Sequence, residues 1–316
     1  MKSVGSPSIR TDVINYCDDM LKIFKNKSLE LRCFQDSVEE WSKVPTVLTS
    51  SVQLNNEVVS PVVSIDEAVL YFKTFDFTKT AGKTLPEKRK FCELFRWMKS
   101  PHLQEELSAE SDFINSLTQC SLDWADGMQC RILQTIFRCL TGARLDCPLR
   151  GTHWQLIGFQ GNDPATDLRG VGLFGLLQFL YLTCDQMLPL GLKLYKVANS
   201  ESQPFPLAVL SLNLTNIVLN VFNTGKLNRE CNARKSVINT VNSFYAALLI
   251  YTFNIWVTQK KTIKDSGYIL KDAEKYCCRN IRKVLKELPK HLQKYDISNV
   301  NTGWKLAAVG DEASAD

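Results

Sequence analysis

The chain carries apolar residues at helical spacing over most of its length, without the sustained apolar–polar alternation of a half-buried β-strand. The helical pattern is clearest from residue 86 onward. It predicts helices over about 86–99, 103–119, 127–141, 207–223, 229–259 and 266–288, and an almost wholly apolar helix that ends near Leu182. We therefore expect an all-α protein with one multi-helix domain over residues 81–298, built around that buried apolar helix.

The helix predicted over 127–141 has the clearest ends. Asp126 is well placed to cap its first turn through a side-chain oxygen, and Gly142 suits the left-handed position that closes a helix. The residues expected to face the core recur every three or four positions and are Ile132, Leu133, Ile136, Phe137 and Leu140.

The first 80 residues show a weaker pattern. Apolar spacing predicts short helices around 14–24 and 65–77, whereas 43–64 hold two prolines among small polar residues, as extended linkers do. We expect 1–80 to be an N-terminal region that is partly disordered or made of short helices. We expect 299–316 to be a flexible tail.

Two stretches, 202–225 and 236–259, contain no charged residue and are long enough to cross a membrane. Their interiors argue against this, because the first carries amides at helical spacing and the second several amides and hydroxyls. Unpaired amides are costly in hydrocarbon. We predict central buried helices in place of membrane spans. The amides of the first stretch are Asn213, Asn216, Asn220 and Asn223.

The composition, 45% hydrophobic and 22% charged residues, is that of a globular protein, and the net charge of +5 does not indicate nucleic-acid binding. The eleven cysteines form no CxxC pair, and the three histidines have no metal-spaced partner. The N-terminus lacks the apolar run of a secretory signal. We expect reduced thiols, no bound metal and a cytoplasmic location.

Two nucleotide-binding patterns are incomplete. Gly82-Lys83-Thr84 resembles the end of a P-loop, but the glycine required five positions earlier is replaced by Phe77. Residues 170–175 match GxGxxG, but a dinucleotide site needs a strand before and after this motif. We predict instead that Gly172 and Gly175 lie on one helix face and allow another helix backbone to approach closely.

The stretch from Trp154 to Leu182 combines a polar loop with the apolar helix. If Thr166 or Asp167 caps this helix, Arg169 lies in its first turn, where an arginine and unpaired helix N–H groups could bind phosphate oxygens. The alternative is that Arg169 pairs with Asp163 or Asp167 and only holds the loop.

The spacing in this stretch is specific. Trp154-x3-Gly158-Phe159-Gln160-x3-Pro164-x-Thr166-Asp167-Leu168-Arg169-Gly170-x-Gly172 resembles the signature of the ELMO domain, with Leu168 in place of the usual phenylalanine. The resemblance covers about residues 86–290. It is strongest to the ELMO domain-containing proteins, which act as GTPase-activating proteins for Arf-family small GTPases. It implies a GTP-bound Arf-like GTPase as partner, and neither a cofactor nor a nucleotide site in this chain.

The resemblance also implies roles for individual residues. Arg169 matches the arginine that the family's activators need, and Asp167 is expected to orient its guanidinium group. Residues expected to shape the loop or contact the switch regions of the GTPase are Gln160, Asn162, Asp163 and Thr166. Residues expected to anchor or stiffen the loop are Trp154, Gly158, Phe159, Pro164, Gly170 and Gly172.

Two alternatives to an efficient activator stay open at this stage. ELMO domains also occur in scaffold proteins that link small GTPases to cytoskeletal regulators without activating them, and an activator can bind its GTPase yet barely accelerate hydrolysis. The family's links imply the cytoskeleton or the cilium as locations.

A basic ridge on the last predicted helix is typical of a solvated face, or of contact with anionic lipid or an acidic partner. Its residues are Lys271, Lys275, Arg279, Arg282, Lys286 and Lys290.

Overall fold

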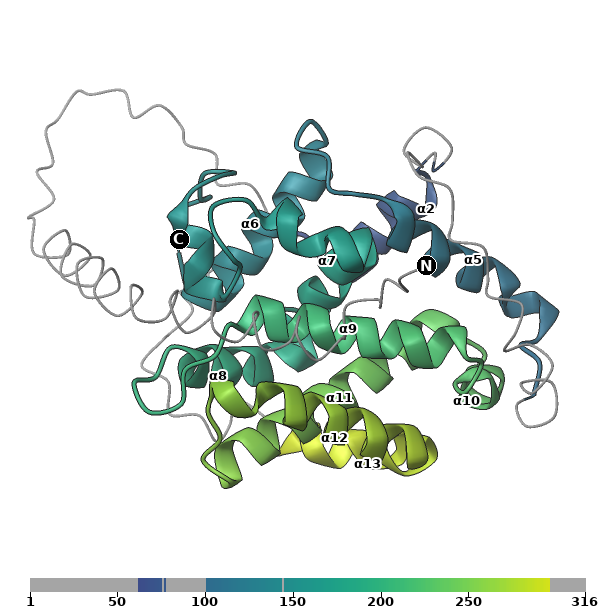
Figure 1. Ribbon diagram of the computed structural model, residues 1–316. Coiled ribbons are helices and arrows are strands. Elements are labelled where there is room, and N and C mark those ends of the chain that lie inside the picture. Colours follow the sequence, from purple (N-terminus) through teal and green to yellow (C-terminus); the bar gives the residue numbers. More distant parts are fainter. Residues whose placement is uncertain (1–61, 76, 78–100, 144, 296–316) are drawn as a thin grey trace, which may run out of the picture.

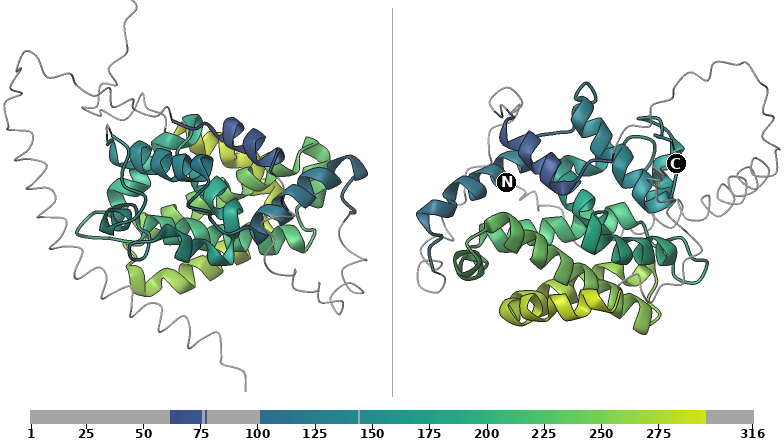
Figure 2. Two further views of the ribbon diagram at one scale, coloured as in Figure 1. Left: turned by 90° about the horizontal axis from the view of Figure 1, so that it is seen from above. Right: turned by 180° about the vertical axis from the view of Figure 1, so that it is seen from behind.

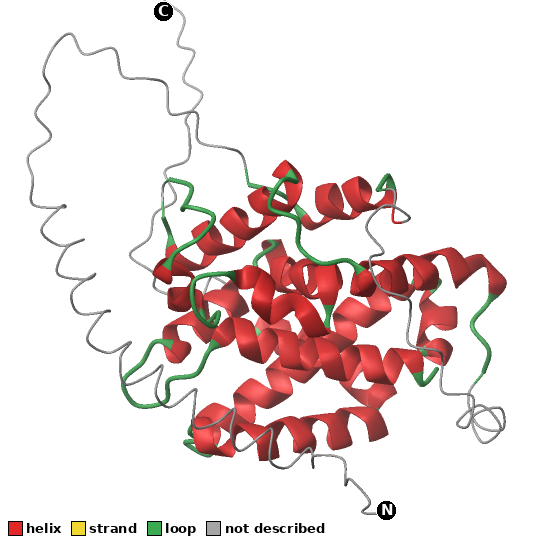
Figure 3. Ribbon diagram, turned by 45° about the horizontal axis from the view of Figure 1, so that its top comes forward, coloured by secondary structure: helices red, strands yellow, loops and turns green. Residues whose placement is uncertain are grey.

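The computed structural model of the protein describes residues 62–75, 77, 101–143 and 145–295, and every regular element within them is a helix (Figures 1 and 3). The predicted all-α class is confirmed. The α-helices are α2 (Ile65–Lys73), α5 (Ser108–Gln119), α6 (Gly127–Thr141), α7 (Gly172–Leu182), α8 (Leu188–Ala198), α9 (Leu207–Asn223), α10 (Asn228–Arg234), α11 (Val237–Thr258), α12 (Ser266–Arg279) and α13 (Ile281–Gln293). The 3-10 helices are η2 (Glu105–Leu107), η3 (Thr152–Ile157), η4 (Pro164–Gly170), η5 (Asp185–Met187) and η6 (Ile263–Asp265).

Several predictions fall outside the described residues. These are the helices around 14–24 and 86–99, the linker over 43–61, the P-loop fragment at 82–84 and the tail over 299–316. The division of the chain at residue 80 stays a prediction. The short helix expected over 65–77 is present as α2, and it packs on α6 and α7 with Ala68 and Phe72 fully buried.

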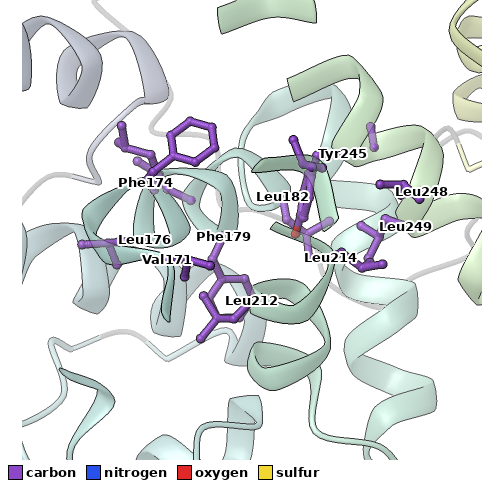
Figure 4. Close-up of a cluster of buried hydrophobic side chains, with 14 of the residues drawn as sticks. Val171, Phe174, Leu176, Phe179, Leu182, Leu212, Leu214, Tyr245, Leu248 and Leu249 are labelled. Atoms are coloured by element: carbon purple, nitrogen blue, oxygen red, sulfur yellow. The ribbon is translucent and has the colours of Figure 1, made fainter. Parts of the chain in front are cut away.

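Helix α7 is the centre of the fold. Ten of its eleven residues are buried, and it packs against α2, α5, α6, α8, α9 and α11. Figure 4 shows Phe179 of α7 beside Leu212 of α9, and Leu182 of α7 beside Leu214 of α9 and Tyr245 of α11. Burial of a large apolar side chain stabilises a fold by about 1.5–3 kcal/mol. The predicted buried central helix is therefore confirmed.

Helices α6 and α9 have the predicted bounds. The Asp126 carboxylate accepts hydrogen bonds from the N–H groups of Met128 and Gln129, and Gly142 closes α6 with φ of 74°. On α9, thirteen of seventeen residues are buried, and the four asparagines form its exposed or half-buried stripe. Among the described residues, no single helix is long and apolar enough to cross a membrane; α9 and α10 together qualify by length and composition, but they are bent by 88°.

The single helix predicted over 229–259 is wrong. The chain turns at Lys235, whose φ is 52°, and separates α10 from α11. The carboxylate of Glu110 on α5 accepts hydrogen bonds from the N–H groups of Val237 at 2.6 Å and Ile238 at 2.9 Å. The unpaired N–H groups in the first turn of α11 are therefore bonded to an acceptor from another helix. A helix that ran without a break through this point would have no unpaired N–H groups here.

The single helix predicted over 266–288 is also wrong. It is divided at Asn280 into α12 and α13, and α13 continues through Pro289 to Gln293. A proline inside a helix leaves the carbonyl group four residues earlier without its usual donor. That carbonyl belongs to Leu285, and Arg234 donates to it at 3.4 Å. Helix α8, with Leu190 and Leu194 fully buried, was not predicted.

Candidate functional site

The segment that carries Arg169 is the 3-10 helix η4. Asp163 caps it, since its carboxylate accepts a hydrogen bond from the Ala165 N–H group at 3.0 Å, and Pro164 occupies the first position. Thr166 donates its hydroxyl hydrogen to the Asp163 carbonyl at 2.8 Å. Neither Thr166 nor Asp167 caps α7, so the placement of Arg169 in the first turn of α7 is wrong. Arg169 lies in the last turn of η4.

Helix α7 begins at Gly172 because of its contact with α5. Gly172 has φ of 58°, and a Cβ atom there would overlap the carbonyl oxygens of Leu117 and Cys120. The N–H group of Leu173 donates to the Cys120 carbonyl at 3.0 Å. This donor in the first turn of α7 is therefore already bonded within the protein and is not free to bind an anion.

Gly172 and Gly175 have different neighbours. Gly172 faces the backbone at the end of α5, as a close approach requires, whereas Gly175 faces the side chains of Val171 and of Leu212 on α9. The expectation that both admit one helix backbone is therefore wrong for Gly175. No strand flanks the motif in the part of the chain that the structure describes, and both glycines are packing positions.

An aromatic series connects the polar loop to the core. Trp154 is fully buried, its indole N–H group donates to the Leu149 carbonyl at 3.0 Å, and its ring meets Phe137 of α6 and Phe159 edge-on. Phe159 in turn meets Phe179 of α7, with ring centroids 5.8 Å apart. Edge-to-face pairs contribute about 0.5–1.5 kcal/mol beyond the area that they bury. These rings join α6, the loop and α7.

Gly158 brings the loop against the start of α9. Its φ of 92° lies in the left-handed region, and a Cβ atom would overlap the main-chain N of Leu207. The Val209 N–H group donates to the Gly158 carbonyl at 3.2 Å. A glycine is required here both by its φ and by the close approach of a second backbone.

Arg169 is exposed, and its Nε–H group donates to the Thr166 carbonyl at 3.1 Å. Within the described residues, it forms no ion pair within 4.0 Å of Asp163 or Asp167. Asp163 lies 3.7 Å from Arg150, and the Asp167 carboxylate accepts the main-chain N–H group of Gln160 at 2.6 Å. Neither the pairing alternative nor direct orientation of Arg169 by Asp167 is seen in the structure.

Asp167 is an unusual carboxyl group. Burial raises its pKa from the ordinary value of 3.8 to about 6, against the opposing effects of the Gln160 N–H group and the nearby charge of Arg169. A carboxylate in poorly solvated surroundings takes up a proton more readily than one in water. Its charge therefore changes near neutral pH, beside the exposed guanidinium group of Arg169.

A shallow polar pocket lies beside Asp167. It is formed by the loop, η4 and the first half of α9, and its lining residues are Gln160, Thr166, Asp167, Gly170, Val171, Val209, Leu212, Asn213 and Asn216. The sequence identified the asparagines as a polar stripe but not as part of this site. Their contribution depends on how Gly158 places the loop against α9.

The remaining predicted residues are less involved. Asn162 is exposed and accepts the Gly151 N–H group through its carbonyl, and Gly170 is exposed with open space around its Cα. No group of three metal-binding side chains occurs among the described residues. The structure thus brings Gln160, Thr166 and Asp167 into one pocket and leaves Arg169 exposed, outside the lining but next in sequence to the lining residue Gly170.

Comparison with known proteins gives consistent matches. The model of the ELMO/CED-12 family matches residues 112–270. The chain is 38% identical to human ELMO domain-containing protein 3 over 280 residues, which is 87% of this chain and 74% of the human protein. It is 36% identical to the mouse protein of the same name over 261 residues, 80% of this chain and 68% of that protein. It is also 30% identical to ELMO domain-containing protein B of Dictyostelium discoideum over 129 residues, 40% of this chain and 45% of that protein. No solved structure matches significantly.

Proposed function

Because this chain belongs to the ELMO/CED-12 family, we propose that it activates GTP hydrolysis by an Arf-like small GTPase, and that Arg169 is the arginine it supplies. Small GTPases hydrolyse GTP slowly because the charge on the transferring phosphoryl group is poorly neutralised. An arginine from a second protein can raise the rate by about 10³–10⁵.

The observation that supports this proposal best is how Arg169 is held. The Thr166 carbonyl takes its Nε–H group, while its terminal guanidinium nitrogens contact no acceptor among the described residues. The two terminal nitrogens present the planar fork that binds phosphate oxygens in pairs. The side chain is thus restrained at one nitrogen and exposed at the two that would meet the phosphate.

The segment that carries Arg169 is held in place by buried residues. The neighbouring Leu168 is buried, with 1% of its surface exposed, and Pro164 is buried at the start of η4. Helix α7 follows directly and packs against six other α-helices. A catalytic group contributes most when its position is set before the reaction begins, because the cost of ordering it is then met by folding.

We assign the contact with the GTPase to the pocket and the stripe beside Arg169. The stripe runs along α9 from Asn213 through Asn216 and Asn220 to Asn223, and carries no charge. Each amide can donate and accept hydrogen bonds, as required to bind the main chain of another protein. This surface would receive a switch region while Arg169 reaches the nucleotide.

The test is single-turnover GTP hydrolysis by a panel of purified Arf-like GTPases, with and without this protein. We expect acceleration by wild type and its loss in both Arg169→Ala and Arg169→Lys, because lysine retains the charge but not the planar fork. Arg229→Ala, which removes an exposed arginine on α10, is the matched control and should keep full activity.

The other outcomes are informative. No acceleration of any GTPase, together with binding of a GTP-loaded one, would favour the scaffold function. Acceleration that survives Arg169→Ala would retain the activity and reject Arg169 as its source.

A further inference from the structure

The positive charge of the chain is concentrated near the end of the described residues. Residues 257–295 hold eleven basic and four acidic residues, a net charge of +7, whereas the whole chain carries +5. The rest of the chain is therefore slightly acidic. Asp272 is the sole fully exposed acidic residue in this segment, all of which the structure describes.

Six exposed basic residues of this segment form what we call the basic face: Lys271, Lys275 and Arg279 of α12, and Arg282, Lys286 and Lys290 of α13. The sequence predicted them as one ridge on one helix, and the break at Asn280 divides them between two. Spacing of four and eight residues places the members of each trio on one side of their helix.

The opposite sides of both helices are fixed by packing. Ala273 and Cys277 of α12 and Leu285 and Leu288 of α13 are buried, and both helices pack on α11. Figure 1 and the right view of Figure 2 show them together along the lower edge of the molecule, away from α2. Since the buried sides of both helices face the interior, each basic trio lies on the outward side of its helix, and the two helices are neighbours at this edge.

The charges of the basic face are not neutralised locally. Within the described part of the chain, none of its six residues forms an ion pair within 4.0 Å. Tyr268 lies on the same side of α12, three and seven residues before Lys271 and Lys275, and 74% of its surface is exposed. An exposed tyrosine among lysines is typical of a surface that meets lipid headgroups, where an aromatic ring with a polar end is favoured.

We propose that the basic face binds the surface of a membrane that contains anionic lipids. Clusters of four to eight lysines and arginines on an amphipathic helix are attracted to anionic headgroups. Lysine predominates on the basic face, where it supplies four of the six residues. Lysine acts as a flexible point charge suited to a diffuse surface, whereas recognition of nucleic acid or of a protein carboxylate favours the fixed fork of arginine.

The experiment is sedimentation of the full chain with vesicles of phosphatidylcholine, alone or with about 30% phosphatidylserine. The basic-face variant Lys275→Gln/Arg282→Gln/Lys286→Gln is compared with Lys73→Gln/Lys196→Gln/Arg229→Gln, whose three sites are exposed on α2, α8 and α10. Both variants lose three positive charges, so they differ only in where the charge was removed. Thermal unfolding verifies that both fold, and Lys275→Gln alone serves if the triple variant does not.

We expect wild type to bind the anionic vesicles at about 0.1 M salt and to dissociate from them at about 0.5 M salt. It should not bind vesicles of pure phosphatidylcholine. The basic-face triple should bind roughly a hundredfold more weakly, since each charge contributes about tenfold or less, and the control triple should bind as wild type does. The single variant should lose a few-fold.

Three results would overturn the proposal. The first is no binding of wild type at low salt, and the second is equal loss in the two triples. The third is binding of polyglutamate or duplex DNA through the same residues as tightly as vesicles, which would assign the face to acidic macromolecules. The measurement contains no GTPase, so its outcome is independent of the activity proposed for Arg169.

Discussion

The carboxylate of Asp167 accepts the main-chain N–H group of Gln160 at 2.6 Å, and this hydrogen bond closes the loop that carries Arg169. It joins the start of the polar loop to η4 across seven residues. Because burial raises the pKa of Asp167 to about 6, the charge on this bond's acceptor depends on pH in the neutral range.

We expect Asp167→Asn to change how stability depends on pH. A carboxyl group whose pKa is raised by folding stabilises the protein at low pH, and this contribution is lost as pH rises from about 4 through about 6. Asparagine keeps an acceptor oxygen for the Gln160 N–H group and does not ionise. The melting temperature of the variant minus that of wild type should therefore increase as the pH is raised from 4.5 to 7.5.

Asp272→Asn, on the exposed side of α12, controls for the loss of one negative charge. If the melting temperatures of wild type and Asp167→Asn changed with pH in the same way across this range, Asp167 would not titrate as its burial predicts.

Gly158→Ala should destabilise the fold strongly. A left-handed φ costs a residue with a Cβ atom about 1–2 kcal/mol, and the added carbon would also overlap the main chain of α9 at Leu207. Gly161→Ala is the matched control, since Gly161 has φ of 68° but open space around it. Denaturant unfolding should give a clearly larger loss for Gly158→Ala, and similar losses would mean that the contact with α9 can shift at little cost.

Glu110→Gln should destabilise the junction of α10 and α11. The carboxylate accepts hydrogen bonds from two main-chain N–H groups and from the Ser236 hydroxyl, and its charge faces the positive end of the α11 dipole. The uncharged amide weakens these bonds, which we expect to cost about 1–2 kcal/mol. Glu106→Gln, on the exposed surface of η2, should leave the free energy of unfolding unchanged. Equal losses of unfolding free energy in Glu110→Gln and Glu106→Gln would exclude Glu110 as a specific cap of α11.

Asn213→Ala/Asn216→Ala should weaken the encounter with the GTPase without altering the chemical step. Loss of two hydrogen-bonding side chains at the pocket should raise the concentration of this protein needed for half-maximal activation roughly tenfold. The maximal rate should stay near that of wild type. Asn223→Ala lies at the far end of the stripe, about 15 Å along α9 from Asn213, and should have a smaller effect.

A kinetic titration separates the two quantities. A loss of maximal rate with an unchanged half-maximal concentration would contradict the assignment of these asparagines to docking.

Helices whose ends depend on neighbouring residues could be predicted from the sequence. The Asp126 cap and the Gly142 stop lie within one turn of α6, and α9 was predicted to the residue, directly after Pro204 and Pro206. The central place of α7 also followed from composition, because a helix without polar groups must be covered on all sides. The motif from Trp154 to Gly172 identified the family, which the comparisons confirm.

Features whose partners lie far along the chain could not be predicted in this way. At the break before α11 the Val237 N–H group is bonded to Glu110, 127 residues earlier, and the carbonyl left open by Pro289 in α13 accepts a hydrogen bond from Arg234. The start of α7 is set by the carbonyl groups at the end of α5, and this leaves Arg169 on η4, outside the first turn of α7.

The pocket shows the same division between local and distant information. Gln160, Thr166 and Asp167 come from one contiguous motif, but the asparagines that complete the pocket come from α9, against which Gly158 places the loop. Local periodicity encodes which residues form a helix and which side of it is buried, because both depend on neighbours within a turn or two. Where a helix breaks and what faces Arg169 depend on hydrogen bonds and packing between distant segments, which exist only once the chain has folded.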